Sequence, residues 1–316
     1  GNFVFEGIYD KRIIQASHRR APLDEVMDVC NLYQSRYSDF NVKHFYRWYK
    51  YEHHGKRSYS WLKDTLQKRG LVQRVRKKGI HRKKRERSPY PGMMIHQDGS
   101  THEWVPGKKW DLIVTMDDAT NEHYSMFFVD EEGTASSFQG VQEVIEKHGL
   151  FSSFYSDRGS HYWYTPKAEG KVDKTRLTQF GRAMSKLSIE MIPAYSPEAR
   201  GRSERMFGTH QDRLVTELAL AGIIEMSKAN QYIKKVYMPN FNDEFMVPAP
   251  QQGSAFIPWV GEDIEDILCE QYKRTVTKDN CISFKGLSLQ IPKDEYRCHY
   301  IKAKIRVNFY NDGRTA

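Results

Sequence analysis

Three acidic residues have the type and spacing to bind catalytic metal ions: Asp98, Asp157 and Glu204. Asp98 and Asp157 each end a run typical of a β-strand, and Glu204 falls in the opening turn of an expected helix. Three like charges held close together would repel one another strongly unless divalent cations bridged them. Carboxylate oxygens are hard ligands that select Mg²⁺ or Mn²⁺. Two such ions, about 3.5–4 Å apart, can activate an attacking oxygen and stabilise a leaving one in phosphodiester chemistry.

The elements that must position these carboxylates read as an α/β sheet. Expected strands cover residues 93–98, 109–116, 123–129, 150–156 and 189–193, and expected helices cover 134–148, 174–187 and 203–221. Three antiparallel strands, followed by strands that alternate with helices, are typical of a ribonuclease-H-like fold. In such a sheet the fourth strand lies beside the first. We therefore expect Asp98 and Asp157 to meet at one edge, where rigid elements can hold them.

Other acidic residues compete for the same role. Asp117 and Asp118 end the second expected strand, but an acidic turn is commonplace there. Glu198 competes with Glu204, but it precedes Gly201 in an expected loop. A ligand carried by a helix is held more accurately than one on a loop, so the sequence favours Glu204.

Basic side chains flank the expected carboxylate site. His96 lies two residues before Asp98, on the same face of its strand, where it would either fill the rim or orient substrate. Arg158 and His161 follow Asp157 closely, and contact with the scissile phosphate is an open role for both. Three arginines lie close to Glu204 in the sequence: Arg200, Arg202 and Arg205. Contact with a DNA phosphate is favoured for them over simple balancing of the acidic charge.

Positive charge is concentrated in the first part of the chain. The 316 residues carry a net charge of +9, but residues 1–90 hold 22 Lys and Arg against 9 Asp and Glu, a net of +13. The remainder carries 27 against 31, a net of −4. A basic front joined to a slightly acidic remainder favours a nucleic-acid partner.

The front of the chain, residues 1–73, reads as a helical DNA-binding region. Helices are expected after Ala21-Pro22, after Asn41 and from Ser58, and the last two resemble a helix-turn-helix. In that arrangement the third helix would enter the major groove and present Ser60, Lys63, Gln67 and Lys68. A small helical bundle without groove contact is the alternative.

Residues 74–90 form an expected basic linker, with nine Lys or Arg in the fourteen residues from 74 to 87. Such a run cannot pack a core and favours salt-dependent phosphate contact, although a localisation signal is the usual rival. The expected contacts are Arg74, Arg76, Lys77, Lys78, Arg82, Lys83, Lys84 and Arg85. The turn-forming residues 88–92 then separate this linker from a catalytic core at 91–222.

Residues 223–267 are expected to form a helical, Pro-rich connector, with a helix over 227–236. Residues 268–316 read as a small SH3-like β-barrel, which we expect to be truncated at Ala316. The four cysteines are scattered without a CxxC pair, which argues against a zinc cluster or a disulfide framework. No apolar run approaches the ~18 residues of a membrane span, so we expect a cytoplasmic, nucleoid-associated protein.

Three segments together carry a family resemblance: HQDG at residues 96–99, YSDRGSH at 155–161, and YSP at 195–197 with GRSER at 201–205. They resemble the DDE transposases of bacterial insertion sequences with a retroviral-integrase-type core, of which the ISNCY group is the nearest. The resemblance extends over nearly the whole chain. It implies metal-ligand roles for Asp98, Asp157 and Glu204, and binding of terminal inverted repeats and target DNA by a homo-oligomer, at least a dimer. It also implies hydrolysis at the element's end, followed by attack of the freed 3′-hydroxyl on target DNA.

This sequence departs from retroviral integrases in two ways. Asp157 and Glu204 are 47 positions apart, and the extra length corresponds to a polar insert at residues 161–178. The His/Cys zinc module of those integrases is also missing, and the helical front would replace it. Two other functions stay open: a non-catalytic DNA-binding regulator with a nuclease-like fold, and a plain metal-dependent DNA nuclease.

Overall fold

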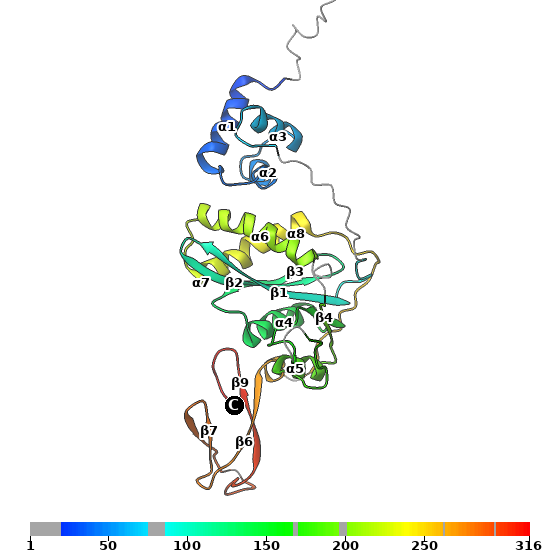
Figure 1. The fold of residues 1–316 in the computed structure, drawn as a ribbon, viewed down its shortest axis with the longest axis vertical. Coiled ribbons are helices and arrows are strands. Elements are labelled where there is room, and N and C mark those ends of the chain that lie inside the picture. Colours follow the sequence, from blue (N-terminus) through cyan, green and yellow to red (C-terminus); the bar gives the residue numbers. More distant parts are fainter. Residues whose placement is uncertain (1–19, 75–85, 167–169, 196–200, 262, 294) are drawn as a thin grey trace, which may run out of the picture. The chain divides into compact units, whose positions relative to one another are not determined.

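The computed structural model describes residues 20–74, 86–166, 170–195, 201–261, 263–293 and 295–316, without the side chains of 201–203 (Figure 1). The chain divides into two compact units, residues 1–82 and 83–316. Each unit is considered by itself. Among the helices of the described ranges, none is long and apolar enough to cross a membrane.

The first unit contains three helices, α1 (Leu23–Arg36), α2 (Val42–Tyr51) and α3 (Tyr59–Lys68). They begin where the sequence predicts. The Asn41 and Ser58 side chains cap α2 and α3 by accepting backbone N–H bonds, which satisfies donors that a helix start leaves free. Their core is largely aromatic: Tyr33, Tyr37, Phe40, Phe45 and Tyr49 are buried.

The second unit is built on a five-stranded sheet of β1 (Met94–Val105), β2 (Lys108–Asp117), β3 (His123–Val129), β4 (Ser153–Ser156) and β5 (Glu190–Pro193). The strand order is β3-β2-β1-β4-β5. The first three strands are antiparallel, whereas β4 is parallel to β1 and β5 to β4. This mixed sheet has the ribonuclease-H-like topology that the sequence predicts.

The first strand is longer than predicted, because it continues past residue 98 to Val105 and forms a hairpin with β2. Gly107 makes this turn possible with a φ of 75°, a conformation that favours glycine. The polar residues 99–103 read as a loop in the sequence. In the structure they are the solvent-facing part of a strand whose end, Trp104 and Val105, is buried.

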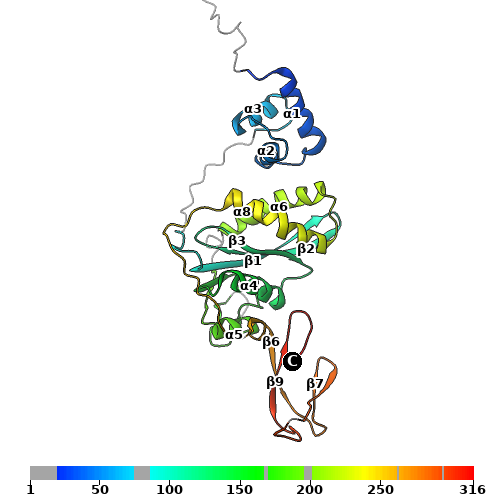
Figure 2. The same cartoon turned by 180° about the vertical axis from the view of Figure 1, so that it is seen from behind.

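Helices cover both faces of this sheet (Figures 1 and 2). On one face lie α4 (Thr134–His148) and α5 (Gln179–Lys186), whose apolar side chains pack with those of β4. On the other lie α6 (Gly201–Leu220), α7 (Met226–Tyr232), a π-helical turn η3 (Ile233–Tyr237) and α8 (Met238–Phe245).

The region predicted as a connector, 223–267, therefore contributes to the core. Ala229, Ile233, Tyr237 and Phe241 are buried with side chains of the sheet and α6. The sequence predicts a helix that ends at residue 236, and Pro239 lacks the N–H that an α-helix interior requires. The chain instead widens into the π-turn, in which the N–H of Met238 bonds to the carbonyl of Ile233, and the helix then resumes.

The C-terminal residues form small sheets, as predicted. One pairs β6 (Glu270–Thr275) with β9 (Lys304–Phe309), and the other pairs β7 (Cys281–Phe284) with β8 (Leu287–Gln290). Their common core includes Val276, Ile282, Phe284 and Val307. In the described part of this region the two sheets do not join into a closed barrel.

Candidate active site

One predicted carboxylate, Asp98, lies on β1, and a second, Asp157, directly follows the neighbouring strand β4. The parallel register of β1 and β4 pairs Ile95 with Phe154 and His96 with Tyr155. Continued for two more residues, this register would set Asp98 opposite Asp157. Both residues are half-buried, so their oxygens are held by the fold but remain within reach of solvent.

The Asp157 loop is fixed locally by its own carboxylate. Oδ1 of Asp157 accepts the backbone N–H of Gly159 at 2.8 Å. A side chain at Gly159 would begin only 3.0 Å from that oxygen, so this position leaves little room for anything larger than glycine. Asp98 similarly accepts the N–H of Gly99 at 3.1 Å.

A buried amide ties the Asp157 loop to the strand that carries Asp98. Gln97 is 2% exposed, and its Oε1 accepts the hydroxyl of Tyr162 at 2.8 Å. Its Nε2 donates to Thr115 Oγ1 at 2.8 Å and to the Ser137 carbonyl at 3.3 Å. The hydrogen bond from Tyr162 to Gln97 forms only while the Tyr162 hydroxyl carries its proton. Burial, together with the negative charges of Glu132, Asp157 and Asp98, raises the pKa of Tyr162 well above its ordinary value.

Glu132, from the loop that leads into α4, also lies beside β1. A methyl group added to Gly99 would come within 2.2 Å of Glu132 Oε2, and Glu132 Oε1 lies 3.5 Å from His161 Nε2. Sequence reasoning did not identify Glu132, Gln97 or Tyr162. An acidic residue next to a helix start after the third strand was a usable indication for Glu132, but nothing local marks the Gln97–Tyr162 bond.

The rivals Asp117 and Asp118 have structural partners. Asp117 Oδ1 accepts the N–H of Gly92 and its Oδ2 accepts the N–H and hydroxyl of Thr120, at 2.9–3.0 Å. Burial nevertheless raises the pKa of Asp117. Asp118 accepts the N–H and hydroxyl of Ser88 through Oδ2, and its Oδ1 lies 2.9 Å from His96 Nε2. These contacts hold the segment before β1 against the sheet. The contact with Asp118 also holds the His96 side chain at the rim of the site. Of its two predicted roles, this position fits filling the rim.

The third predicted carboxylate, Glu204, is exposed in the first turn of α6. Seven residues later, Gln211 donates to Ser100 Oγ at 3.0 Å, and Ser100 shares a strand face with Asp98. Two helical turns separate Glu204 from Gln211, so both lie on the side of α6 that faces β1. Across the described residues, no three His, Cys, Asp or Glu side chains are grouped to hold a metal ion. The complete three-carboxylate site thus stays a prediction.

Asp98 and Asp157 by themselves fit a divalent cation. Each offers hard oxygen donors, Asp98 lies on β1 while Asp157 directly follows the adjacent strand β4, and both are partly accessible. Two carboxylates in such proximity favour a cation between them, because it offsets their mutual repulsion.

The predicted DNA contacts fall in several parts of the structure. Ser60, Lys63 and Lys68 are exposed on α3, with Gln67 half-buried, and Arg74 and Arg205 are also exposed. Arg158 donates to the Gly170 carbonyl at 3.0 Å and lies over the ring of Tyr195, so it helps to hold the insert. The side chain of Arg202 is not described. Eight predicted residues lie outside the described ranges: Arg76, Lys77, Lys78, Arg82, Lys83, Lys84, Arg85 and Arg200, together with the rival Glu198.

A buried chain of hydrogen bonds fixes α6 to the sheet. His123 Nε2 lies 3.0 Å from His210 Nε2, His210 Nδ1 lies 2.9 Å from the Tyr237 hydroxyl, and His123 Nδ1 lies 3.0 Å from the Asn121 carbonyl. All three contacts are satisfied if Tyr237 donates to His210, His210 donates to His123, and His123 donates to Asn121. Both imidazoles are then neutral. Burial lowers the pKa of His123 to about 4 and that of His210 well below its ordinary value.

We expect the buried hydrogen bonds among His123, His210 and Tyr237 to make the fold acid-sensitive. The folded-state pKa of His123 lies below its unfolded value, so the stabilisation is complete above pH 6.5 and is lost as the pH falls towards 4. For His123 alone the loss is about 3 kcal/mol. Thermal unfolding between pH 7.5 and 4.5 should show a falling Tm that is flatter in His123→Gln. His299→Gln, which alters an exposed histidine, serves as the control. A wild-type Tm that does not change over this range would contradict the assignment.

Comparison with known proteins gives sequence relatives but no matching family model. The chain is 30% identical over 260 residues to "Putative transposase y4bF" of Sinorhizobium fredii, covering 80% of this chain and 55% of that protein. It is 28% identical over 161 residues to the transposase for insertion sequence IS1202 of Streptococcus pneumoniae, covering 51% of this chain and 34% of that protein. The chain thus spans about half or less of the length of these relatives.

Solved structures of viral integration proteins are also similar. A chain of the simian T-cell lymphotropic virus intasome, in complex with a PP2A regulatory subunit, matches with a TM-score of 0.43 and 13% identity, covering 79% of this chain and 90% of that one. The HTLV-2 integrase catalytic core domain in complex with magnesium matches with a TM-score of 0.36 and 15% identity, covering 46% and 87%. In sequence, then, four fifths of the chain is similar to a bacterial protein named as a transposase, and half of it to the transposase of an insertion sequence.

Proposed function

We propose that this protein is a metal-dependent DDE transposase that cuts DNA at the ends of its element and joins them to target DNA. The observation that carries this proposal is the parallel pairing of β1, which contains Asp98, with β4, which directly precedes Asp157, in a chain similar to a transposase over 80% of its length. Strand cleavage and strand transfer are both in-line phosphoryl displacements, so one carboxylate site serves both steps.

In this mechanism Asp98, Asp157 and Glu204 hold Mg²⁺ or Mn²⁺, two ions per site. When bound, the ions supply Lewis-acid stabilisation of the charge that develops on the phosphate. The residues of the chain bind and orient the DNA. Asp98 is carried by β1, Asp157 directly follows β4, and the bond from Gln211 to Ser100 supports the placement of the Glu204 face of α6 over β1. Holding the terminal hydroxyl and the target phosphate in one geometry lowers the entropic cost of the second step.

The remaining features of the proposal concern the DNA and the assembly. α3 reads the terminal inverted repeats in the major groove, and the basic linker contacts their phosphates. A homo-oligomer, at least a dimer, pairs the two ends. We also propose that the protein belongs to the ISNCY group of transposases. The C-terminal sheets would then be part of an SH3-like barrel.

The decisive experiment combines the protein with labelled end DNA, a target plasmid and Mg²⁺ or Mn²⁺. Joined products, detected by gel electrophoresis, would support a transposase. Cleavage without joining would instead indicate a metal-dependent nuclease, and binding without either reaction would indicate a regulator.

Recognition by α3 gives a separate prediction. We expect Gln67→Ala to cost about 1–3 kcal/mol of binding to end DNA and to relax sequence preference at one base pair. Lys63→Ala should weaken binding to all duplexes alike and reduce the salt slope by about one. Fluorescence anisotropy at several salt concentrations measures both effects. Lys228→Ala, which removes an exposed lysine of α7, is the control. Equal effects of all three substitutions would contradict groove reading by α3.

A further inference from the structure

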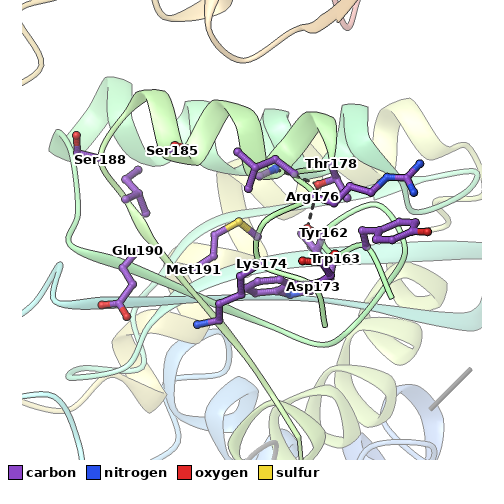
Figure 3. Close-up of a pocket in the computed structure, with 14 residues that line it drawn as sticks. Tyr162, Trp163, Asp173, Lys174, Arg176, Thr178, Ser185, Ser188, Glu190 and Met191 are labelled. Carbon is purple, nitrogen blue, oxygen red and sulfur yellow. Dashed lines mark hydrogen bonds between the residues drawn. The ribbon is translucent and has the colours of Figure 1, made fainter. Parts of the chain in front are cut away.

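A cavity of about 400 Å³ lies between residues 162–164, residues 173–178, α5 and β5 (Figure 3). One wall is aromatic, formed by Trp163 and Tyr164, and apolar side chains of Leu177 and Met191 complete the lining. Leu177 is 53% exposed at the rim of the cavity. A flat, apolar ligand would cover it.

The polar groups of the cavity suit a nucleotide better than a simple anion or cation. Figure 3 shows Arg176 on one side and Glu190 on the other. The guanidinium of Arg176 lies 3.9 Å from the ring centre of Tyr164, which leaves its planar outer face available for stacking. Lys174 and Arg176 are exposed and can contact a phosphate, and Glu190 can accept from a base amino group.

The remaining acidic group is already satisfied. Asp173 Oδ1 accepts the N–H and the hydroxyl of Thr175, at 2.9 and 2.6 Å. These bonds, together with the charge of Arg176, lower the pKa of Asp173, so its carboxylate stays charged. That charge offsets part of the positive charge of Lys174 and Arg176, which makes the apolar and aromatic lining the main basis for binding.

The cavity is connected directly to the carboxylate edge. Tyr162 lines it, and the hydroxyl of the same residue bonds to Gln97 next to Asp98. Trp163 Nε1 donates to Ser156 Oγ at 3.1 Å, immediately before Asp157. The segment from Asp157 to Tyr164 thus runs from the proposed cleavage site into the cavity wall. A nucleotide displaced from a helix end at that site would meet this wall first.

We propose that this cavity receives one unstacked nucleobase of the DNA end, adjacent to the phosphate that is cut. This inference rests on the proposed function. The volume of the cavity is in the range of small-ligand pockets and suits a single nucleotide. Enzymes that work on DNA commonly hold an extruded base between aromatic and apolar side chains. Stacking of about 1–3 kcal/mol per base would offset the energy of unstacking it.

The test uses the full chain and end duplexes with 2-aminopurine at each of the terminal positions in turn. Extrusion of one base leaves its neighbour partly unstacked, and an unstacked 2-aminopurine fluoresces more strongly than a stacked one. Binding should therefore raise the emission severalfold when 2-aminopurine is next to the base that enters the cavity. That rise should disappear in Arg176→Ala and in Leu177→Ser. It should persist in Lys171→Ala, which removes an exposed lysine outside the cavity lining. Arg176→Ala should also lower strand joining, and joining should recover when the base that enters the cavity is removed.

The outcomes separate this inference from the proposed function. If end DNA is joined to target but no position brightens, or if the rise survives both cavity substitutions, the cavity does not hold a base. If dAMP alone raises the Tm of the wild type but not of Arg176→Ala, and DNA shows no unstacking, the cavity binds free nucleotides and the inference is wrong. If end DNA is neither joined nor cut, the proposed function itself fails, whatever the fluorescence shows.

Discussion

Replacing either strand-borne carboxylate, as Asp98→Asn or Asp157→Asn, is expected to reduce strand joining by about a thousandfold or more. Each substitution removes one charged ligand from the pair that faces across β1 and β4. A metal site contributes several kcal/mol of transition-state stabilisation, and about 4 kcal/mol corresponds to a thousandfold in rate. Binding of end DNA should persist, because the proposed recognition elements lie elsewhere in the chain.

A second measurement links this loss to metal binding. Mn²⁺ should raise the Tm of the wild type, since a ligand that binds only the folded state stabilises it, and should not raise that of Asp157→Asn. Glu146→Gln, an exposed carboxylate on α4, should retain both joining and the Mn²⁺ response. Full joining by Asp98→Asn or Asp157→Asn would show that the site is wrongly assigned.

The third ligand can be identified in the same assay. Glu204→Gln is expected to behave like Asp157→Asn, because the face of α6 that carries Glu204 lies over β1. If Glu204→Gln joins strands normally, the third carboxylate lies elsewhere. Glu132 would then be the first candidate, since it already lies beside Gly99 and His161.

Asp118→Asn should lower the Tm through its lost bonds to Ser88 without changing the Mn²⁺ response.

Much of the fold could be predicted because its determinants are local. The caps Asn41 and Ser58 mark helix starts that depend only on neighbouring residues. The buried strands β2 and β3 are marked by continuous apolar sequence. The prediction that β1 and β4 are neighbours followed from the order of strands rather than from any single residue, and it is confirmed.

The parts that could not be predicted depend on contacts between distant segments. The π-turn at 233–237 keeps a helix intact across Pro239 because its apolar side chains are buried against the sheet. His123 and His210 meet across 87 residues, and Gln97 and Tyr162 across 65. No spacing rule connects residues so far apart, so the groups that tie the site together emerged only from the three-dimensional structure.

Removal of the Tyr162 hydroxyl, which donates to Gln97, is expected to have the second large effect on strand joining. Tyr162→Phe removes one oxygen and leaves Gln97 Oε1 buried without its donor, which costs about 1–3 kcal/mol of stability. The loop from Asp157 to Tyr162 would then be held less firmly against the strand of Asp98. Residues that orient metal ligands commonly change affinity or activity about 10–100-fold when altered. We expect joining to fall by that factor, with end binding unchanged and a higher Mn²⁺ concentration needed for half-maximal rate.

A buried tyrosine of the first unit separates positioning from mere stability. Tyr33→Phe also removes a buried hydroxyl, which donates to the Phe40 carbonyl at 2.9 Å, and should lower the Tm. It should leave the Mn²⁺ requirement unchanged, because the first unit carries none of the proposed metal ligands. Gln97→Leu combined with Tyr162→Phe should be little worse than Gln97→Leu alone, since Gln97→Leu already breaks the bond that Tyr162→Phe removes. If Tyr162→Phe lowered the Tm but left the Mn²⁺ requirement of the wild type, the hydroxyl would only stabilise the fold, and the spacing of Asp98 and Asp157 would be set by the sheet alone.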